Sequence, residues 1–169
     1  HAAQAQFQCV PYNEPVPFAD GCTARWIEAG HILGSACLVI EMKRNGDEPV
    51  RLLFTGDLGR FHVPILRDPA NPLPKVDYLI TECTYADRRH ANPTDMKQQL
   101  VRIIRETCEA GGKVIIPAFS VGRTQTIVYY LSQAIAEGLL DPLPIFVDSP
   151  LSTHATDRKS TRLNSSHTI

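Results

Sequence analysis

Three side chains that could bind a metal ion or move a proton each follow an apolar stretch of the sequence. His31 lies in GHILGSA (residues 30–36), Asp57 in FTGDLGR (54–60) and Glu82 in ECTYADRRH (82–90). A polar residue at the point where a buried strand ends lies at the rim of a sheet, where α/β proteins usually build their sites. An imidazole and a carboxylate together are the mixed nitrogen and oxygen ligands that Zn²⁺ accepts. These three residues are therefore the candidate site.

Each of the three also has an ordinary structural explanation. A lone histidine such as His31 is more often a hydrogen-bonded polar residue than a ligand, and Asp57 could cap a backbone amide within a turn. Glu82 could be a surface carboxylate that caps the loop after Thr81. Their combination favours a metal site, because four glycines let the backbone turn sharply and approach a bound ion closely: Gly30, Gly34, Gly56 and Gly59.

The first half of the chain reads as strands. Residues 23–29, 37–42 and 50–55 predict an antiparallel unit, with Asn45-Gly46 as a hairpin turn. Residues 60–75 contain four prolines and are expected to form a loop over the site. That loop leads into a predicted strand at 76–81.

The second half alternates helices with strands. Asn92 and Pro93 predict the start of a helix that continues to Gly111-Gly112, and residues 123–137 repeat the helical period. Apolar runs at residues 113–119 and 145–147 predict two further strands. This order indicates an α/β protein.

Composition narrows the class of protein. The 169 residues are 43% hydrophobic and carry a formal charge of −1, and no stretch resembles a membrane span or a secretory leader. The five cysteines are odd in number and lack CxxC spacing, which favours a reduced, cytoplasmic setting over a disulfide framework. With no basic signature, contact with nucleic acid would need a local groove.

Both ends of the sequence are expected to be unusual. The chain starts at His1 and reads as the interior of a longer protein. Residues 157–169, DRKSTRLNSSHTI, look like the translation of a sequencing-adapter oligonucleotide and are expected to stay outside the fold.

Five stretches in order carry a resemblance to a known family. They are GHILGSA, FTGDLGR and ECTYADRRH, followed by PAFSVGRTQ (117–125) and PIFVDSPLS (144–152). Over residues 7–156 the chain resembles the metallo-β-lactamase fold, and within it the β-CASP branch of RNA-processing nucleases. The resemblance implies an α/β protein with part of an αββα sandwich at residues 1–141 and the start of a β-CASP domain at 142–156, before the tail at 157–169.

The resemblance also implies roles for the candidate residues. His31 would bind one zinc ion, Asp57 would bridge two, and Glu82 would orient a histidine from a later motif that protonates the leaving oxygen. Zinc lowers the pKa of water from about 15.7 to about 7, which suits phosphodiester hydrolysis at neutral pH. The implied function is zinc-dependent cleavage of RNA. Zn²⁺ would be the cofactor and RNA the partner, and no membrane is expected as a partner.

One departure from the family pattern limits this expectation. The family's HxHxDH motif, which supplies four ligand side chains, is not present in these 169 residues. Catalytic zinc needs three or more protein ligands, so the fragment by itself is expected to be inactive. Two alternatives stay open: another hydrolase of the same fold that acts on small esters, and a non-catalytic scaffold subunit. The sequence does not decide whether the RNA would be cut internally or from an end. It also does not decide whether the protein forms a homodimer.

Other polar residues have weaker claims. Arg123, at a predicted helix start, could meet a phosphate or could equally brace its loop. Cys83 could be a nucleophile, but core packing is the favoured interpretation. No catalytic role is expected for three further histidines: His62, His90 and His154.

Overall fold

The computed structural model describes residues 4–43, 48–88, 96–118 and 121–157. It divides into two compact units, residues 1–88 and 89–169, and each is described by itself. The predicted turn at Asn45-Gly46, the helix cap at Asn92 and Pro93, and residues 158–169 lie outside the described residues. The predicted division between two domains after residue 141 stays a prediction.

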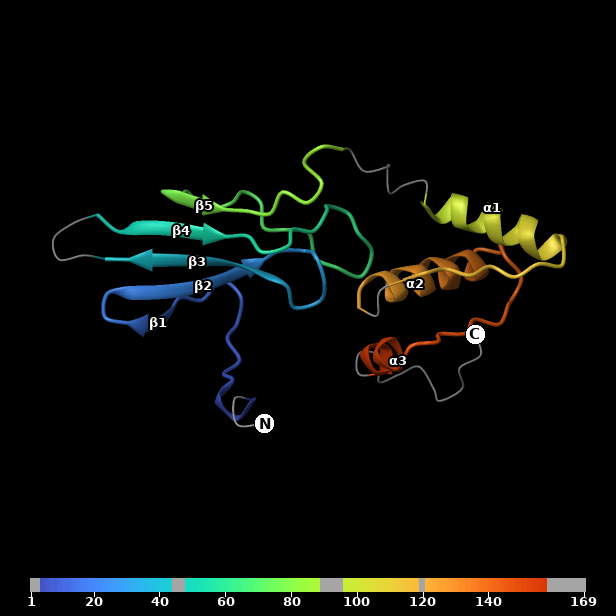
Figure 1. Ribbon diagram of the computed structural model, residues 1–169, viewed down its shortest axis with the longest axis horizontal. Coiled ribbons are helices and arrows are strands. Elements are labelled where there is room, and N and C mark those ends of the chain that lie inside the picture. Colours follow the sequence, from blue (N-terminus) through green and yellow to red (C-terminus); the bar gives the residue numbers. More distant parts are fainter. Residues whose placement is uncertain (1–3, 44–47, 89–95, 119–120, 158–169) are drawn as a thin grey trace. The chain divides into compact units, whose positions relative to one another are not determined.

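The first unit is built on one five-stranded sheet (Figure 1). A short 3₁₀ turn, η1 (Gln4–Gln6), precedes it. The strands lie in the sheet in the same order as in the sequence: β1 (Val16–Ala19), β2 (Cys22–Glu28), β3 (Ala36–Met42), β4 (Val50–Phe54) and β5 (Tyr78–Ile80). The predicted strands are thus confirmed, and β1 was not predicted.

Strand directions decide where the strand ends meet. β2, β3 and β4 pair antiparallel, with Ile27 opposite Cys37 and Val39 opposite Leu53. β5 pairs parallel to β4, with Leu79 beside Leu53. The carboxyl ends of β2, β4 and β5 therefore lie at the same end of the sheet.

Alternate residues of the central strands form the core of this unit. Side chains two apart along a strand share one face of the sheet, and five of these are buried. Three partly buried side chains from the segments after β4 pack on them, namely Leu58, Ala70 and Val76. The buried five are Ile27, Ala29, Cys37, Val39 and Leu53. Residues 60–75 form no strand, as predicted, and Ala70 packs this segment on the buried side chains of the sheet.

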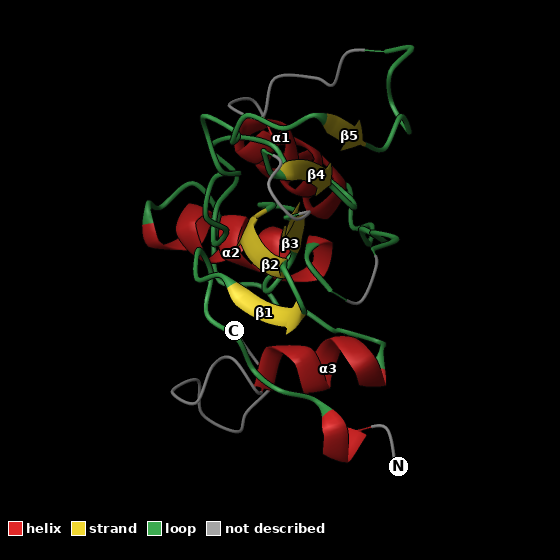
Figure 2. Ribbon diagram, turned by 90° about the vertical axis from the view of Figure 1, so that its left-hand side faces the viewer, coloured by secondary structure: helices red, strands yellow, loops and turns green. Residues whose placement is uncertain are grey.

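The second unit contains three helices: α1 (Met96–Glu109), α2 (Arg123–Ala136) and α3 (Pro150–Asp157). In Figure 2 the strands, drawn in yellow, all belong to the first unit, and α1 to α3 are drawn in red. Val101 and Ile104 of α1 pack with Leu131 and Ala134 of α2 and with Leu140. The predicted helices at these positions are confirmed, and α3 was not predicted.

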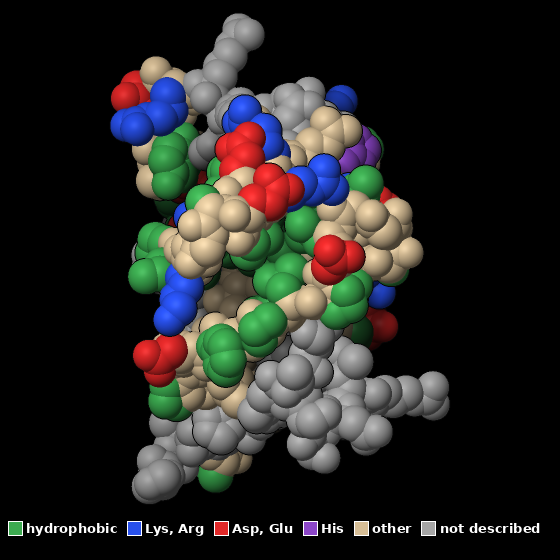
Figure 3. All heavy atoms as spheres, turned by 90° about the vertical axis from the view of Figure 1, so that its right-hand side faces the viewer, with side chains coloured by type: hydrophobic (Ala, Val, Ile, Leu, Met, Phe, Trp, Pro, Cys, Tyr) green, Lys and Arg blue, Asp and Glu red, His purple; other side chains and the backbone are tan. Residues whose placement is uncertain are grey.

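Two predicted strands are not formed. Residues 113–118, the described part of 113–119, and residues 145–147 have no strand pairing in the described part of the chain. Ile115 is 90% exposed and Phe146 is 87% exposed. Figure 3, which shows the right-hand face of Figure 1, has apolar side chains at its surface. A strand needs a neighbouring strand to satisfy its backbone groups, and an apolar run alone does not provide one.

The described residues therefore combine a mixed sheet with helices, which confirms the α/β class. The αββα sandwich of two sheets stays a prediction. Within the described ranges, no helix has the length and apolar character needed to cross a membrane.

Candidate metal centre

The three candidate residues follow the three strands whose carboxyl ends share one end of the sheet. His31 comes three residues after β2, Asp57 three residues after β4, and Glu82 two residues after β5. Because these strands all point the same way, their following loops begin side by side. This is the physical reason that residues far apart in the sequence converge.

The His31 loop is a tight turn closed by Ser35. The Ser35 hydroxyl accepts hydrogen bonds from the backbone N–H groups of His31 (3.0 Å) and Ile32 (3.2 Å). Gly30 begins the turn with φ +66°, and its N–H donates to Glu28 Oε1 at 3.0 Å. These bonds set the direction in which the imidazole leaves the backbone. Sequence reasoning missed Ser35, although a hydroxyl in a short polar turn is a usual signal for such a bond.

The Asp57 loop is joined directly to the His31 loop. Gly56 turns the chain with φ +55° immediately before Asp57. Two residues after Asp57, the N–H of Gly59 donates to the carbonyl of Ala29 at 2.9 Å. The backbones that carry His31 and Asp57 are therefore held together before any ion binds.

His31 and Asp57 present their polar atoms to each other. Nε2 of His31 lies 3.8 Å from Oδ2 of Asp57, and the two side chains are 43% and 74% exposed. Two donors of one tetrahedral zinc ion, at bond lengths of about 2.0–2.2 Å, lie roughly 3.3–3.6 Å apart. A small rotation of either side chain would bring the pair to that spacing, so the two donors fit a shared zinc ion.

The two donors do not make a complete zinc site. In the described parts of the chain, no group of three or more His, Cys, Asp or Glu side chains converges to hold a metal ion. His31 and Asp57 would therefore be part of a ligand set.

Glu82 binds the backbone of the Asp57 loop. Its Oε1 accepts a hydrogen bond from the N–H of Leu58 at 2.7 Å. This bond is the main cause that lowers the pKa of the Glu82 carboxyl, followed by the Thr84 side chain; the Thr84 N–H and the nearby His31 contribute less. These Thr84 contacts agree with the alternative interpretation, a carboxylate that caps the loop after Thr81, and the predicted orienting role stays a prediction. The Leu58 bond adds a contact that sequence reasoning did not predict.

A hydroxyl cluster lies beneath the site. Thr55 is 1% exposed, and its hydroxyl lies 2.8 Å from the carbonyl of Gly56 and 3.1 Å from the hydroxyl of Thr81. The N–H of Glu82 also points to the Thr55 hydroxyl, at 3.4 Å. Thr55 therefore ties the end of β4 to the end of β5. Sequence reasoning missed it, because a threonine at a strand end carries no distinctive pattern.

The remaining candidates stay outside this group. His62 lies in the loop at residues 60–75, where its N–H donates to Asp68 Oδ1 at 2.6 Å and its Nδ1 lies 3.5 Å from Asp68 Oδ2. Arg123 is exposed at the first residue of α2, and both interpretations of its role stay open. His90 and the side chain of His154 lie outside the described residues.

The interpretation of Cys83 as a core residue is wrong. The Cys83 thiol is exposed, because the chain leaves the edge strand β5 just before it.

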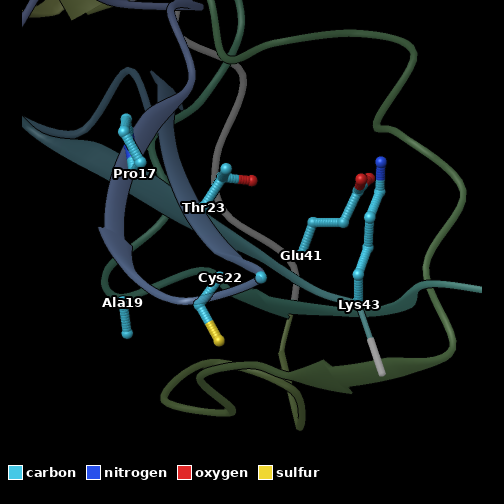
Figure 4. Close-up of a pocket in the computed structure, with 7 residues that line it drawn as sticks. Pro17, Ala19, Cys22, Thr23, Glu41 and Lys43 are labelled. Atoms are coloured by element: carbon cyan, nitrogen blue, oxygen red, sulfur yellow. The ribbon is translucent and has the colours of Figure 1, made fainter. Parts of the chain in front are cut away.

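A shallow hollow of about 160 Å³ lies at the opposite end of the sheet, where β2 begins and β3 ends. Figure 4 shows Glu41 and Lys43 side by side at this hollow, with Cys22 and Thr23 nearby. It is separated from His31 and Asp57 by the length of the strands.

Comparison with curated proteins places these motifs in context. The chain is 34% identical over 156 residues to an RNase J-like protein of Methanocaldococcus jannaschii, an alignment that covers 91% of the chain. A span this long necessarily includes His31, Asp57 and Glu82. The chain belongs to the β-CASP branch of the metallo-β-lactamase-fold hydrolases.

Two other relatives of the β-CASP branch agree. The transcription termination factor FttA of Methanosarcina mazei is 35% identical over 152 residues, which cover 86% of the chain. Ribonuclease TTHA0252 of Thermus thermophilus is 37% identical over 126 residues, which cover 74% of the chain. The chain spans 36%, 23% and 27% of the lengths of these three relatives. No family model matches the sequence.

Proposed function

We propose that this chain is part of a longer zinc-dependent ribonuclease, called the parent protein below. The observation that carries the proposal is the approach of His31 Nε2 to Asp57 Oδ2 at 3.8 Å, at the end of the sheet where three strand ends meet. The ribonuclease named among the relatives, and the RNase J-like protein, support RNA as the substrate. A cytoplasmic location agrees with an RNA substrate and with the free cysteines.

In the parent protein His31 would bind one of two zinc ions and Asp57 would bridge them. Zinc in such a site lowers the pKa of water to about 7, which allows hydrolysis of a phosphodiester at neutral pH. The bridging carboxylate would also offset the charge of the two ions. Glu82 would lie beside them and orient the histidine that protonates the leaving oxygen.

The 169 residues by themselves would be inactive. His31 and Asp57 supply two donors, and a catalytic zinc site uses three or more protein ligands. The further ligands would come from parts of the parent protein beyond this sequence.

The test is RNA cleavage by the parent protein and its variants. We expect His31→Ala to reduce the cleavage of an end-labelled single-stranded RNA by about 100-fold or more, in line with the loss of a metal ligand or its support. The matched control is His62→Ala, which removes a second histidine paired with a carboxylate, in the 60–75 loop. It should leave cleavage within about twofold of the wild-type rate, as surface substitutions usually do.

The same assay separates the alternatives. A scaffold subunit would leave the RNA intact in the wild-type protein, with or without added zinc. A hydrolase of small esters would leave the RNA intact and hydrolyse p-nitrophenyl phosphate or a thioester. Both results would contradict the proposal, and the sizes of the labelled products would distinguish internal from terminal cleavage.

A further inference from the structure

The bond between Glu82 and Leu58 joins two strand-end loops that carry different candidate residues. Glu82 Oε1 accepts from the N–H of Leu58 at 2.7 Å, and Leu58 follows Asp57 directly. The acceptor is a carboxylate, and hydrogen bonds to ionised acceptors are about twice as strong as neutral ones. This hydrogen bond therefore holds the backbone next to Asp57, the proposed bridging carboxylate.

The Asp57 side chain needs such support from its backbone. It is 74% exposed, and Gly56 before it has no side chain to pack and a φ of +55°. On the other side of Asp57, the N–H groups of Leu58 and Gly59 are both engaged, by Glu82 and by Ala29. Among the described contacts, these two bonds hold the backbone just after Asp57.

The position of Glu82 is itself fixed. Its N–H points to the buried hydroxyl of Thr55 at 3.4 Å, and Thr55 N–H donates to the carbonyl of Ile80 at 3.0 Å. The carboxylate thus reaches Leu58 from a backbone that is anchored to β4. Thr55 and Leu58, the two ends of one four-residue segment, are therefore both hydrogen-bonded to Glu82.

We propose that Glu82 is a positioning residue that holds the Asp57 loop in place through the N–H of Leu58. This role rests on the proposed function, because holding the loop affects the chemistry only if Asp57 binds zinc. It is separate from any part that Glu82 plays in orienting a histidine. It needs an acceptor oxygen at this position, whereas the orienting role needs the negative charge.

Two substitutions separate the two roles. Glu82→Gln keeps an acceptor oxygen and removes the charge, whereas Glu82→Ala removes both. In the 169-residue chain, hydrogen exchange of the Leu58 amide, followed by NMR, reports the bond directly. We expect exchange to be about tenfold or more faster in Glu82→Ala than in the wild-type chain, and intermediate in Glu82→Gln.

Two controls accompany this measurement. Asp68→Ala removes another carboxylate that accepts a backbone hydrogen bond, from His62, and should leave Leu58 exchange unchanged. The amide of Leu53, in the buried core of β4, should exchange at the same slow rate in every variant if the unit stays folded. If Leu53 exchange rises in Glu82→Ala, the comparison rests on Glu82→Gln, whose Leu58 exchange must still exceed the wild-type rate.

Zinc affinity of the parent protein gives the second readout. Partners that support a metal ligand typically contribute about 10–100-fold to metal affinity. We expect zinc to bind about tenfold or more weakly in Glu82→Ala, with a smaller loss in Glu82→Gln.

Each negative result has a distinct meaning. Leu58 exchange that is the same in the wild-type, Gln and Ala chains would overturn the positioning role and leave the proposed function intact. Leu58 exchange that is faster in the Glu82→Ala chain, together with a parent protein that binds no zinc, would contradict the proposed function. It would still support the hydrogen bond from the Leu58 N–H to Glu82. Equal zinc affinity in the wild-type and Ala proteins would overturn the link between the bond and the metal site.

Discussion

Gly59 and Gly30 pack backbone against backbone: a Cβ atom built on Gly59 would overlap the carbonyl group of Gly30 and lie 2.6 Å from the N–H nitrogen of His31. The N–H of Gly59 also donates to Ala29 at 2.9 Å. The loops that carry His31 and Asp57 can therefore meet only because residue 59 has no side chain. Glycine is required here for close approach of two backbones.

Gly59→Ala is expected to destabilise the first unit and to separate the two loops. The loss should be about 3 kcal/mol, at the upper end for overpacking, because the obstacle is backbone that cannot rotate away. Urea unfolding measures this loss. Gly34→Ala, in the His31 loop, is the control: Gly34 has φ +88° and open space around it, so backbone strain of about 1–2 kcal/mol is its main cost. Equal losses in the two variants would contradict the packing argument.

Thr55→Val tests the hydroxyl cluster under the site. Valine has nearly the same shape as threonine, so the substitution removes the hydroxyl and leaves the packing of this buried residue. The N–H of Glu82 and the hydroxyl of Thr81 would lose a partner, at a cost of about 1–3 kcal/mol. Thr23→Val, on a partly exposed strand position, is the control and should change the free energy of unfolding by less than about 0.5 kcal/mol. A Thr55→Val chain as stable as wild type would show that the cluster contributes nothing.

Cys37 should be the least reactive thiol of the first unit. It is fully buried, and burial, with a smaller effect of the Glu28 charge, raises the pKa of its thiol above the ordinary value of 9.0. Less thiolate forms at any given pH, so iodoacetamide at pH 8 should label the exposed Cys9 and Cys83 well before Cys37. Mass spectrometry of the labelled peptides measures the order. Labelling of Cys37 at the same rate as Cys83 would contradict the buried position.

The same shift has a consequence for stability at high pH. Because the thiol of Cys37 releases its proton more readily in the unfolded chain, its contribution is complete below pH 9 and is lost as the pH rises above that value. A Cys37→Ala chain should therefore lose less stability between pH 8 and pH 10 than the wild-type chain. An equal loss in both would show that another group dominates the alkaline transition.

Much of the first unit could be predicted from the sequence. The alternation of apolar and polar residues in β2, the apolar run in β3 and the turn residues between segments are local signals, and the structure confirms those strands. The convergence of His31 with Asp57 could also be predicted, because it follows from strand ends. The bonds of Thr55, Gly59 and Glu82 could not, because they join residues from different loops and leave no mark in either stretch of sequence.

The second unit shows the opposite case. The helices α1 and α2 follow from their period and from Gly111 and Gly138, which end them with φ near +70°. The apolar runs at residues 113–118 and 145–147 carry the signal of buried strands but find no pairing partner among the described residues. Apolar composition indicates what a segment can bury, whereas a strand also needs a neighbour with free backbone groups.

Glu82→Gln in the parent protein separates a residue that binds zinc from one that supports the site. At a zinc concentration that saturates both proteins, we expect the zinc content to stay at the wild-type level and RNA cleavage to slow by about 10²–10⁴-fold, the usual effect of losing acid–base assistance. Metal analysis and cleavage rates on the same preparation provide both values. Loss of zinc from Glu82→Gln even at a saturating zinc concentration would show that Glu82 is itself a ligand.

The zinc content of the parent protein with Asp57→Ala is the most direct test of the metal site. Asp57→Ala should lose both zinc ions and RNA cleavage, because one carboxylate would bind and bridge the pair, whereas Asp68→Ala, the control carboxylate in the neighbouring loop, should retain both. Metal analysis by mass spectrometry after dialysis, beside the cleavage rate, measures this difference. An Asp57→Ala protein that keeps two zinc ions per chain and cleaves RNA at the wild-type rate would contradict the metal site at His31 and Asp57.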